Sequence, residues 1–197
     1  MLTNATVADL WRPSEEGRAL VYDFTLVFAG LVFIGLSAQV AIGFPVPFTG
    51  QTFAVLMIGA LYGARLGGIC LISYVLAGAA GLPVFSNFGS GLVFVSGPTG
   101  GYLIGFIVAA FIVGLLAQNG WDRRVWTTIL AMLIGNVIIY AFGLFWLSCL
   151  VGLSSKVLAV GLYPFVLGDV LKTALAAAIL PSGWKLLEHI NPTGRDK

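Results

Sequence analysis

The sequence is poor in charge. It has ten Lys or Arg and eight Asp or Glu residues among 197, so charged residues make up 9% of the chain, against about 25% in a soluble domain. Hydrophobic residues make up 59%, and the mean hydropathy is +1.01. This balance excludes a water-soluble enzyme, a nucleic-acid-binding protein and a disordered chain. We therefore predict an integral membrane protein.

Residues that commonly carry catalysis are also scarce. The single histidine is His189, close to the C-terminus, which excludes a Ser–His hydrolase or a His-rich metal site within the membrane. Cys70 and Cys149 lie far apart in apolar runs and are predicted to act as small hydrophobic residues. The phosphate-binding pattern G-x-x-x-x-G-K-[ST] does not occur. We expect no enzyme activity, no catalytic residue, no metal and no ATP hydrolysis by this chain.

Long uncharged runs predict the membrane helices. A bilayer core of about 30 Å is crossed by roughly 20 apolar residues as a helix. Prolines and glycines divide the runs into six predicted transmembrane helices, at about 24–42, 51–64, 66–81, 99–117, 125–151 and 163–184. The second is so short that five or seven spans are the alternatives. The predicted class is an all-α integral membrane protein. A polar segment at 1–23 precedes the membrane domain at 24–184, and a polar tail follows at 185–197.

The distribution of positive charge predicts the orientation, because Lys and Arg are retained on the cytoplasmic side. With six spans and an internal N-terminus, the inner segments hold Arg12, Arg18, Arg65, Arg123, Arg124, Lys185, Arg195 and Lys197. The outer segments hold only Lys156. Both termini are therefore predicted to be cytoplasmic.

The three outer connections are apolar and contain the prolines Pro45, Pro47, Pro83, Pro98 and Pro164. The longest connection, residues 82–98, is rich in Leu, Val and Phe. Irregular backbone at membrane depth is tolerated where protein buries it or where it lines a cavity. Two interpretations remain: plain turns between helices, or a pocket that opens outward beneath a roof of loops.

Asp169 and Lys172 are the most informative pair, because both lie inside the last predicted helix. Each costs about 2.5–3.5 kcal/mol at mid-membrane on insertion scales. Three residues apart, they share one helix face. They are either a mutually neutralising pair that fixes packing, or a polar ligand site in which Lys172 faces an anion and Asp169 accepts hydrogen bonds. A proton relay fits poorly without partner carboxylates or histidine.

Other polar residues are weaker candidates. Thr49 and Gln51 follow a Pro-Val-Pro segment where the chain re-enters the membrane, and Thr49 could equally cap a helix. Tyr102 ends a Gly-Pro-Thr-Gly-Gly run, whose glycines permit close approach of a ligand or of a neighbouring helix. Asn87 lies in the apolar connection, where its amide needs a partner.

Taken together, these motifs identify a protein family more specifically than any one of them does alone. The chain resembles the BioY family, the biotin-specific S components of prokaryotic energy-coupling factor (ECF) transporters, in the segments 38–39, 45–52, 78–85, 97–102 and 164–172. The resemblance implies the six-helix S-component fold and biotin binding near the outer face of the cell membrane. It also implies assembly with a transmembrane T component and two ABC-type ATPase subunits. Biotin would be transported cargo, not a cofactor.

Position by position, Asp169 and Lys172 match the family's pair on the sixth helix, and Asn87 matches its asparagine-bearing loop. Leu103 departs from the pattern, because some members have a basic residue directly after the Gly-Gly-Tyr. We assign Lys172 to the biotin carboxylate and Asp169 to the ureido N–H groups. A mostly apolar pocket with one ammonium, one carboxylate and a few amides complements biotin.

Small residues on the first predicted helix suggest a partner surface. Thr25 and Ala29 are four apart, and small residues permit close approach between membrane helices. Family members use such residues to meet the T component, although packing within the subunit is an equal alternative here.

Two other functions remain open: an S component for another small vitamin, or a stand-alone membrane carrier. A channel ranks lower because the polar groups do not form a continuous path. The sequence does not indicate whether the chain transports alone or with an ECF module.

Overall fold

The computed structural model describes residues 5–43 and 46–190, which are mostly helical. The elements in chain order are α1 (Val7–Trp11), α2 (Glu16–Gln39), β1 (Ala41–Ile42), β2 (Phe48–Thr49), α3 (Gln51–Ala79), η1 (Ser86–Phe88), α4 (Gly91–Val95), α5 (Gly100–Gln118), η2 (Trp121–Arg123), α6 (Val125–Val151), α7 (Ser155–Gly161) and α8 (Tyr163–Ile190). Segments long and apolar enough to cross a membrane are Glu16–Gln39, Gln51–Ala79, Gly100–Gln118, Val125–Val151 and Val157–His189. The protein is therefore a multi-pass helical membrane protein, as predicted.

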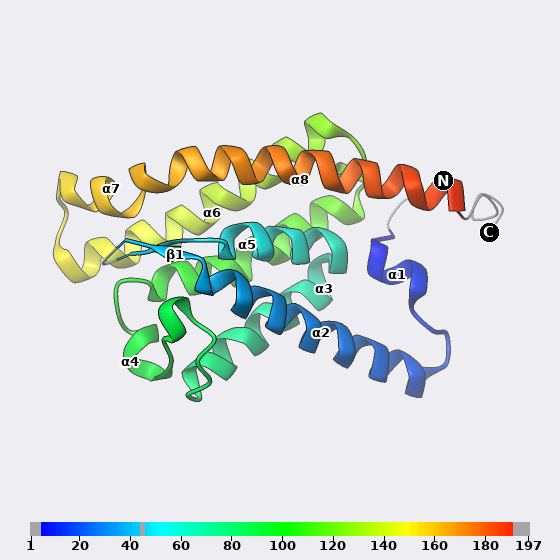
Figure 1. Cartoon of the computed structure of the whole chain (residues 1–197), viewed down its shortest axis with the longest axis horizontal. Coiled ribbons are helices and arrows are strands. Elements are labelled where there is room, and N and C mark those ends of the chain that lie inside the picture. The colour runs from blue at the N-terminus through cyan, green and yellow to red at the C-terminus, as the bar shows by residue number, and fades with distance from the viewer. Residues whose placement is uncertain (1–4, 44–45, 191–197) are drawn as a thin grey trace.

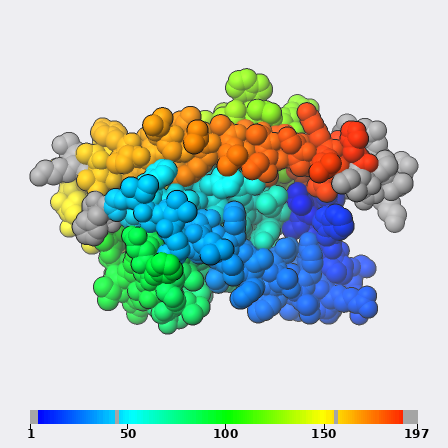
Figure 2. All heavy atoms as spheres, in the orientation of Figure 1, coloured from blue at the N-terminus to red at the C-terminus, as the bar shows by residue number. Residues whose placement is uncertain are grey.

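The long helices run roughly lengthwise through the molecule (Figure 1). The short helix α1 and the last turns of α8 lie at one end, and the β1–β2 hairpin, α4 and α7 lie at the other. In the space-filling view, the cyan atoms around the hairpin lie between the green atoms around α4 and the orange atoms of α8 (Figure 2). The three connections that were predicted to be external thus gather at a single end.

The predicted helix boundaries hold best in the centre of the chain. Helices α5 and α6 match the predictions of 99–117 and 125–151 to within one residue. The prediction for the first helix is wrong at its start, because α2 begins at Glu16 and not at residue 24. A helix need not end where its apolar run ends, since charged residues are good helix formers beyond the bilayer core.

Some residues that contributed to the predicted topology lie outside the described part of the chain. Arg195 and Lys197, which contributed to the predicted cytoplasmic C-terminus, lie outside the described residues, as does Pro45.

At the end that holds α1, Arg12 donates to Asp23 with an Nη2–Oδ2 distance of 2.7 Å. This ion pair joins the chain after α1 to helix α2, and the hydrogen bond to Asp23 raises the pKa of Arg12 above its ordinary value.

Helix α3 occupies the stretch predicted as two helices, 51–64 and 66–81. It is one continuous element by hydrogen bonding, but Gly63 inside it has φ 78° and ψ 177°, far from helical values. The Gln51 Nε2 atom lies 2.8 Å from the Tyr74 hydroxyl, 23 positions along the chain. In a straight helix these residues would be about 34 Å apart. The chain therefore folds back on itself at Gly63, two residues before the predicted break at Arg65.

Gly63 is required at this reversal for two reasons. Its backbone conformation is one that side-chain-bearing residues rarely adopt, and a Cβ there would lie 3.0 Å from Gln118 Nε2 and 3.1 Å from Thr6 Cγ2. Strained backbone of this kind costs about 1–3 kcal/mol. The reversal is thus encoded in one residue that neither hydropathy nor periodicity singles out.

We expect Gly63→Ala to destabilise the protein by about 1–3 kcal/mol, because alanine must adopt this conformation in a crowded position. The melting temperature of the purified protein in detergent measures the effect. Gly17→Ala in α2 is the matched control, since a Cβ there meets nothing within 4 Å. Equal melting temperatures for the two variants would contradict the proposed role of Gly63.

Buried polar contacts hold the end of the molecule that contains α1. The Asp122 carboxylate in η2 is 1% exposed and accepts the indole N–H of Trp184 in α8. Burial raises the pKa of Asp122 above its ordinary value, and the Trp184 hydrogen bond opposes part of that rise. The Arg123 guanidinium carbon lies 4.4 Å from the Trp184 ring centroid, and Arg123 also donates to the Ala5 carbonyl. These contacts join η2, α8 and the chain before α1.

Candidate ligand-binding site

A cavity lies beneath the gathered connections. It is lined by Val46, Pro47, Thr49, Gln51, Thr52, Ser86, Phe94, Thr99, Tyr102, Leu103, Phe106, Ile139, Tyr140, Phe165 and Lys172. Much of the wall is aliphatic or aromatic, and it is contributed by helices α3, α5, α6 and α8 and by the connections before α3 and α5. Such a site suits a small molecule with an apolar body and a few polar groups.

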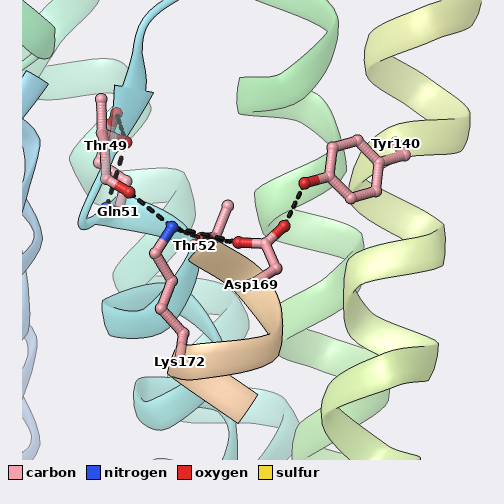
Figure 3. A network of polar contacts seen from close by, with 6 residues as sticks. All are labelled: Thr49, Gln51, Thr52, Tyr140, Asp169 and Lys172. Carbon is pink, nitrogen blue, oxygen red and sulfur yellow. Dashed lines mark hydrogen bonds and ion pairs between the residues drawn. The ribbon is translucent and has the colours of Figure 1, made fainter. Parts of the chain in front are cut away.

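Lys172 contributes the ammonium group of the lining. Its Nζ donates to the Thr49 carbonyl at 2.7 Å and the Thr52 hydroxyl at 2.8 Å, and lies 3.1 Å from Asp169 Oδ1 (Figure 3). The Nζ also lies 4.2 Å from the centroid of the Phe48 ring. An ammonium has three N–H donors, so its hydrogen-bonding capacity is filled by protein oxygens. Helix α8 and the start of α3 are thereby joined through one buried charge.

Asp169 lies behind the cavity surface. Its Oδ2 accepts a hydrogen bond from the Tyr140 hydroxyl of α6, and its Oδ1 accepts one from the Thr52 hydroxyl at 3.1 Å (Figure 3). The residue is 6% exposed and is not among those that line the cavity. A ligand in the cavity therefore meets the Tyr140 and Thr52 hydroxyls before it meets the carboxylate.

Thr49 and Gln51 form a second polar chain along the wall. The Thr49 hydroxyl donates to Gln51 Oε1 at 3.0 Å and accepts the Gln51 backbone N–H at 3.2 Å. Gln51 Nε2 donates to the Tyr74 hydroxyl, which donates in turn to the Val84 carbonyl at 2.8 Å. The start of α3 is thus connected to the segment between α3 and α4.

Tyr102 reaches across the cavity end of α5. Its hydroxyl donates to the Gly161 carbonyl of α7 at 2.8 Å. The glycines before it serve helix packing, because a Cβ at Gly101 would lie 2.2 Å from Trp146 Cβ. Of the two uses considered for these glycines, the close approach is therefore to the neighbouring helix α6.

The structure separates Asn87 from the other predicted site residues. Thr49, Gln51, Tyr102 and Lys172 line one cavity, and Asp169 contacts its wall. Asn87 is exposed in η1 and is not among the lining residues. Its neighbour Ser86 is 5% exposed and does line the cavity. In η1 the cavity-lining residue is therefore Ser86, and the role predicted for Asn87 stays a prediction.

Four polar residues of the cavity lining were not identified from the sequence: Thr52, Ser86, Thr99 and Tyr140. Tyr140 lies within the uncharged run that forms α6, and a buried tyrosine hydroxyl generally requires a polar partner. This requirement could have identified Tyr140 from the sequence as a candidate for the polar part of the site. Thr52 directly follows the singled-out Gln51, but nothing in the sequence indicates that its hydroxyl faces helix α8.

Helix α2 presents the predicted partner residues outward. Thr25 and Ala29 are both exposed, whereas the adjacent Gly30 faces inward. A Cβ at Gly30 would lie 2.5 Å from Cys70 Sγ. The small residues of α2 are therefore divided between two faces, one packed on α3 and one open.

Together, the fold and the cavity define a polytopic helical membrane protein with a largely apolar cavity beneath the connections gathered at one end. The chain belongs to the BioY family, whose family model matches residues 8–189. This membership confirms the resemblance given by the motifs.

Relatives support the same assignment. The biotin transporter BioY of Thermotoga maritima is 42% identical over 153 residues, which cover 78% of this chain and 89% of the relative. The probable biotin transporter BioY of Pyrococcus horikoshii is 39% identical over 162 residues, covering 82% and 94%. The crystal structure of the S-component for biotin from an ECF-type ABC transporter superposes with a TM-score of 0.75 at 26% identity. It covers 87% of this chain and 95% of that one.

Proposed function

We propose that the protein is the substrate-capture subunit of a biotin uptake transporter and binds biotin in the described cavity. The observation that carries the proposal is a single ammonium, that of Lys172, set in an otherwise largely apolar lining beneath the gathered connections. Biotin combines an apolar bicyclic ring with a ureido group and a carboxylate. The family membership and the names of the relatives support this choice of ligand.

Lys172 binds the carboxylate of biotin in this proposal. Because its three donors are occupied by protein oxygens, the carboxylate must replace one acceptor. Of the three acceptors, the Asp169 carboxylate is ionised, whereas the Thr49 carbonyl and the Thr52 hydroxyl are neutral. The Thr52 hydroxyl can turn about its side-chain bond, whereas the Thr49 carbonyl is fixed by the backbone. Thr52 also lines the cavity. We therefore place the carboxylate where the Thr52 hydroxyl now meets the ammonium.

Asp169 acts on the ureido group through Tyr140. The Tyr140 hydroxyl donates its proton to Asp169, which leaves its oxygen free to accept a ureido N–H from the cavity side. Gln51 and Thr49 supply further amide and hydroxyl groups, and Tyr102 bounds the cavity. Each ureido atom needs such a partner because desolvating an unpaired polar group is costly. Asn87 remains a prediction, as a residue of the roof.

The proposal also covers assembly and membrane topology. Thr25 and Ala29 form the contact of α2 with a transmembrane T component, which is joined by two ABC-type ATPase subunits. The two arms of α3 count as separate spans, which gives six in the prokaryotic cell membrane with both termini cytoplasmic. Biotin is cargo, and no resident cofactor is required.

Calorimetry on the detergent-purified protein tests the function. We expect biotin to bind without ATP with a dissociation constant below about 1 μM, which corresponds to about −8 kcal/mol. Other small vitamins such as thiamine and riboflavin should not compete. An absence of heat and of retained biotin at micromolar concentration would disprove the assignment, and competition by another vitamin would favour that vitamin instead.

A further inference from the structure

The turn at residues 85–89 contains unusual backbone. Asn87 has φ 54° and Phe88 has φ 55°, and they are the described non-glycine residues with positive φ. Asn adopts this left-handed region fairly readily, whereas an aromatic residue seldom does. Phe88 is 69% exposed, so burial of its ring does not hold the conformation. Strained backbone persists only where surrounding contacts determine it.

Gln39, at the last position of α2, supplies contacts from outside the turn. The turn also has its own hydrogen bonds, from the Phe85 N–H to the Gly89 carbonyl and from the Gly89 N–H to the Ser86 carbonyl, both at 3.1 Å. The Gln39 Oε1 atom accepts the Phe88 backbone N–H at 2.9 Å, and its Nε2 donates to the Phe85 carbonyl at 3.2 Å. The same amide donates to the Gly35 carbonyl one turn back at 2.9 Å, which holds the side chain in place. One side-chain amide of α2 is thereby hydrogen-bonded to the backbone of both Phe85 and Phe88 in the turn.

The turn at residues 85–89 forms part of the cavity wall. Phe85 is fully buried and stacks on Phe94 with ring centroids 4.9 Å apart. Phe94 and Ser86 both line the cavity, whereas Gln39 does not. Gln39 can therefore influence a ligand only indirectly, through the residues of the turn that it contacts.

We propose that Gln39 is a positioning residue that keeps the roof of the cavity closed over the ligand. The inference rests on the proposed function, and it concerns how long the ligand stays bound. Gln39 holds the turn in its left-handed conformation, the turn seats Phe85, and Phe85 holds Phe94 against the cavity. Without the amide, the turn can relax to ordinary backbone and the roof can lift.

Two variants and one control test the proposal in full-length protein. Gln39→Met removes both contacts at nearly unchanged side-chain length, and Gln39→Glu keeps an acceptor for the Phe88 N–H. Ser37→Ala is the control, since its hydroxyl donates to the Phe33 carbonyl within the same helix. Dissociation of labelled biotin should become roughly tenfold faster in Gln39→Met, less so in Gln39→Glu, and stay unchanged in Ser37→Ala.

The readouts separate positioning from general stability. A purely structural role would lower the melting temperature and the fraction of active protein while leaving the dissociation rate of the active fraction unchanged. That result, in Gln39→Met or, if it does not fold, in Gln39→Glu, would overturn the proposal. Hydrogen exchange of the amides at 85–89 in ligand-free protein should also accelerate in Gln39→Met. Because this readout needs no ligand, it tests the role of Gln39 even if wild-type protein fails to bind biotin.

Discussion

Lys172→Met is expected to weaken biotin binding by roughly 100-fold or more, since breaking a buried ion pair costs about 3–5 kcal/mol. The substitution removes the cation that faces the carboxylate and leaves Asp169 with the hydroxyls of Thr52 and Tyr140 as partners. Titration calorimetry with biotin measures the loss. Lys185→Met, an exposed lysine further along the same helix, is the matched control and should bind normally.

A neutral ligand distinguishes charge recognition from packing. Biotin amide lacks the carboxylate, so Lys172→Met should weaken its binding far less than that of biotin. Asp169→Asn should weaken both ligands similarly, because its effect passes through Tyr140 to the ureido group. Equal losses for both ligands in Lys172→Met would show that Lys172 serves the pairing with Asp169 and Thr49.

Ala29→Trp is expected to abolish assembly with the T component and therefore transport, while biotin binding persists. Ala29 and Thr25 lie on an exposed face of α2, and an indole there would hold a partner helix away. Co-purification of the subunits and uptake of labelled biotin measure assembly and transport. Calorimetry on the isolated subunit measures binding.

Phe28→Trp is the control, because it changes one large exposed side chain of α2 for another. It should assemble and transport normally. Loss of both biotin binding and assembly in Ala29→Trp would instead mean that Ala29 packs within the subunit. Unchanged assembly would remove this face of α2 from the interface.

Hydropathy predicted the class and the central helices because burial in lipid constrains every residue of a span. The runs at 99–117 and 125–151 are bounded by charge, proline and glycine, so their limits could be read directly. Hydropathy predicted the start of α2 less well, because the helix begins at Glu16, in a charged stretch before the apolar run. It also does not reveal the left-handed conformation at Gly63, which joins two predicted helices into α3.

For the site, the sequence by itself singled out Asp169 and Lys172 as candidates, because an ionised group in an apolar helix is costly. Only the tertiary structure decided what they contact. The partners Thr49, Thr52 and Tyr140 are 29 to 123 positions away and are brought together by the packing of α3 and α6 against α8. The local sequence indicates the energetic cost of placing each charged side chain in the membrane. The contacts that offset this cost depend on how the helices pack, which the local sequence does not reveal.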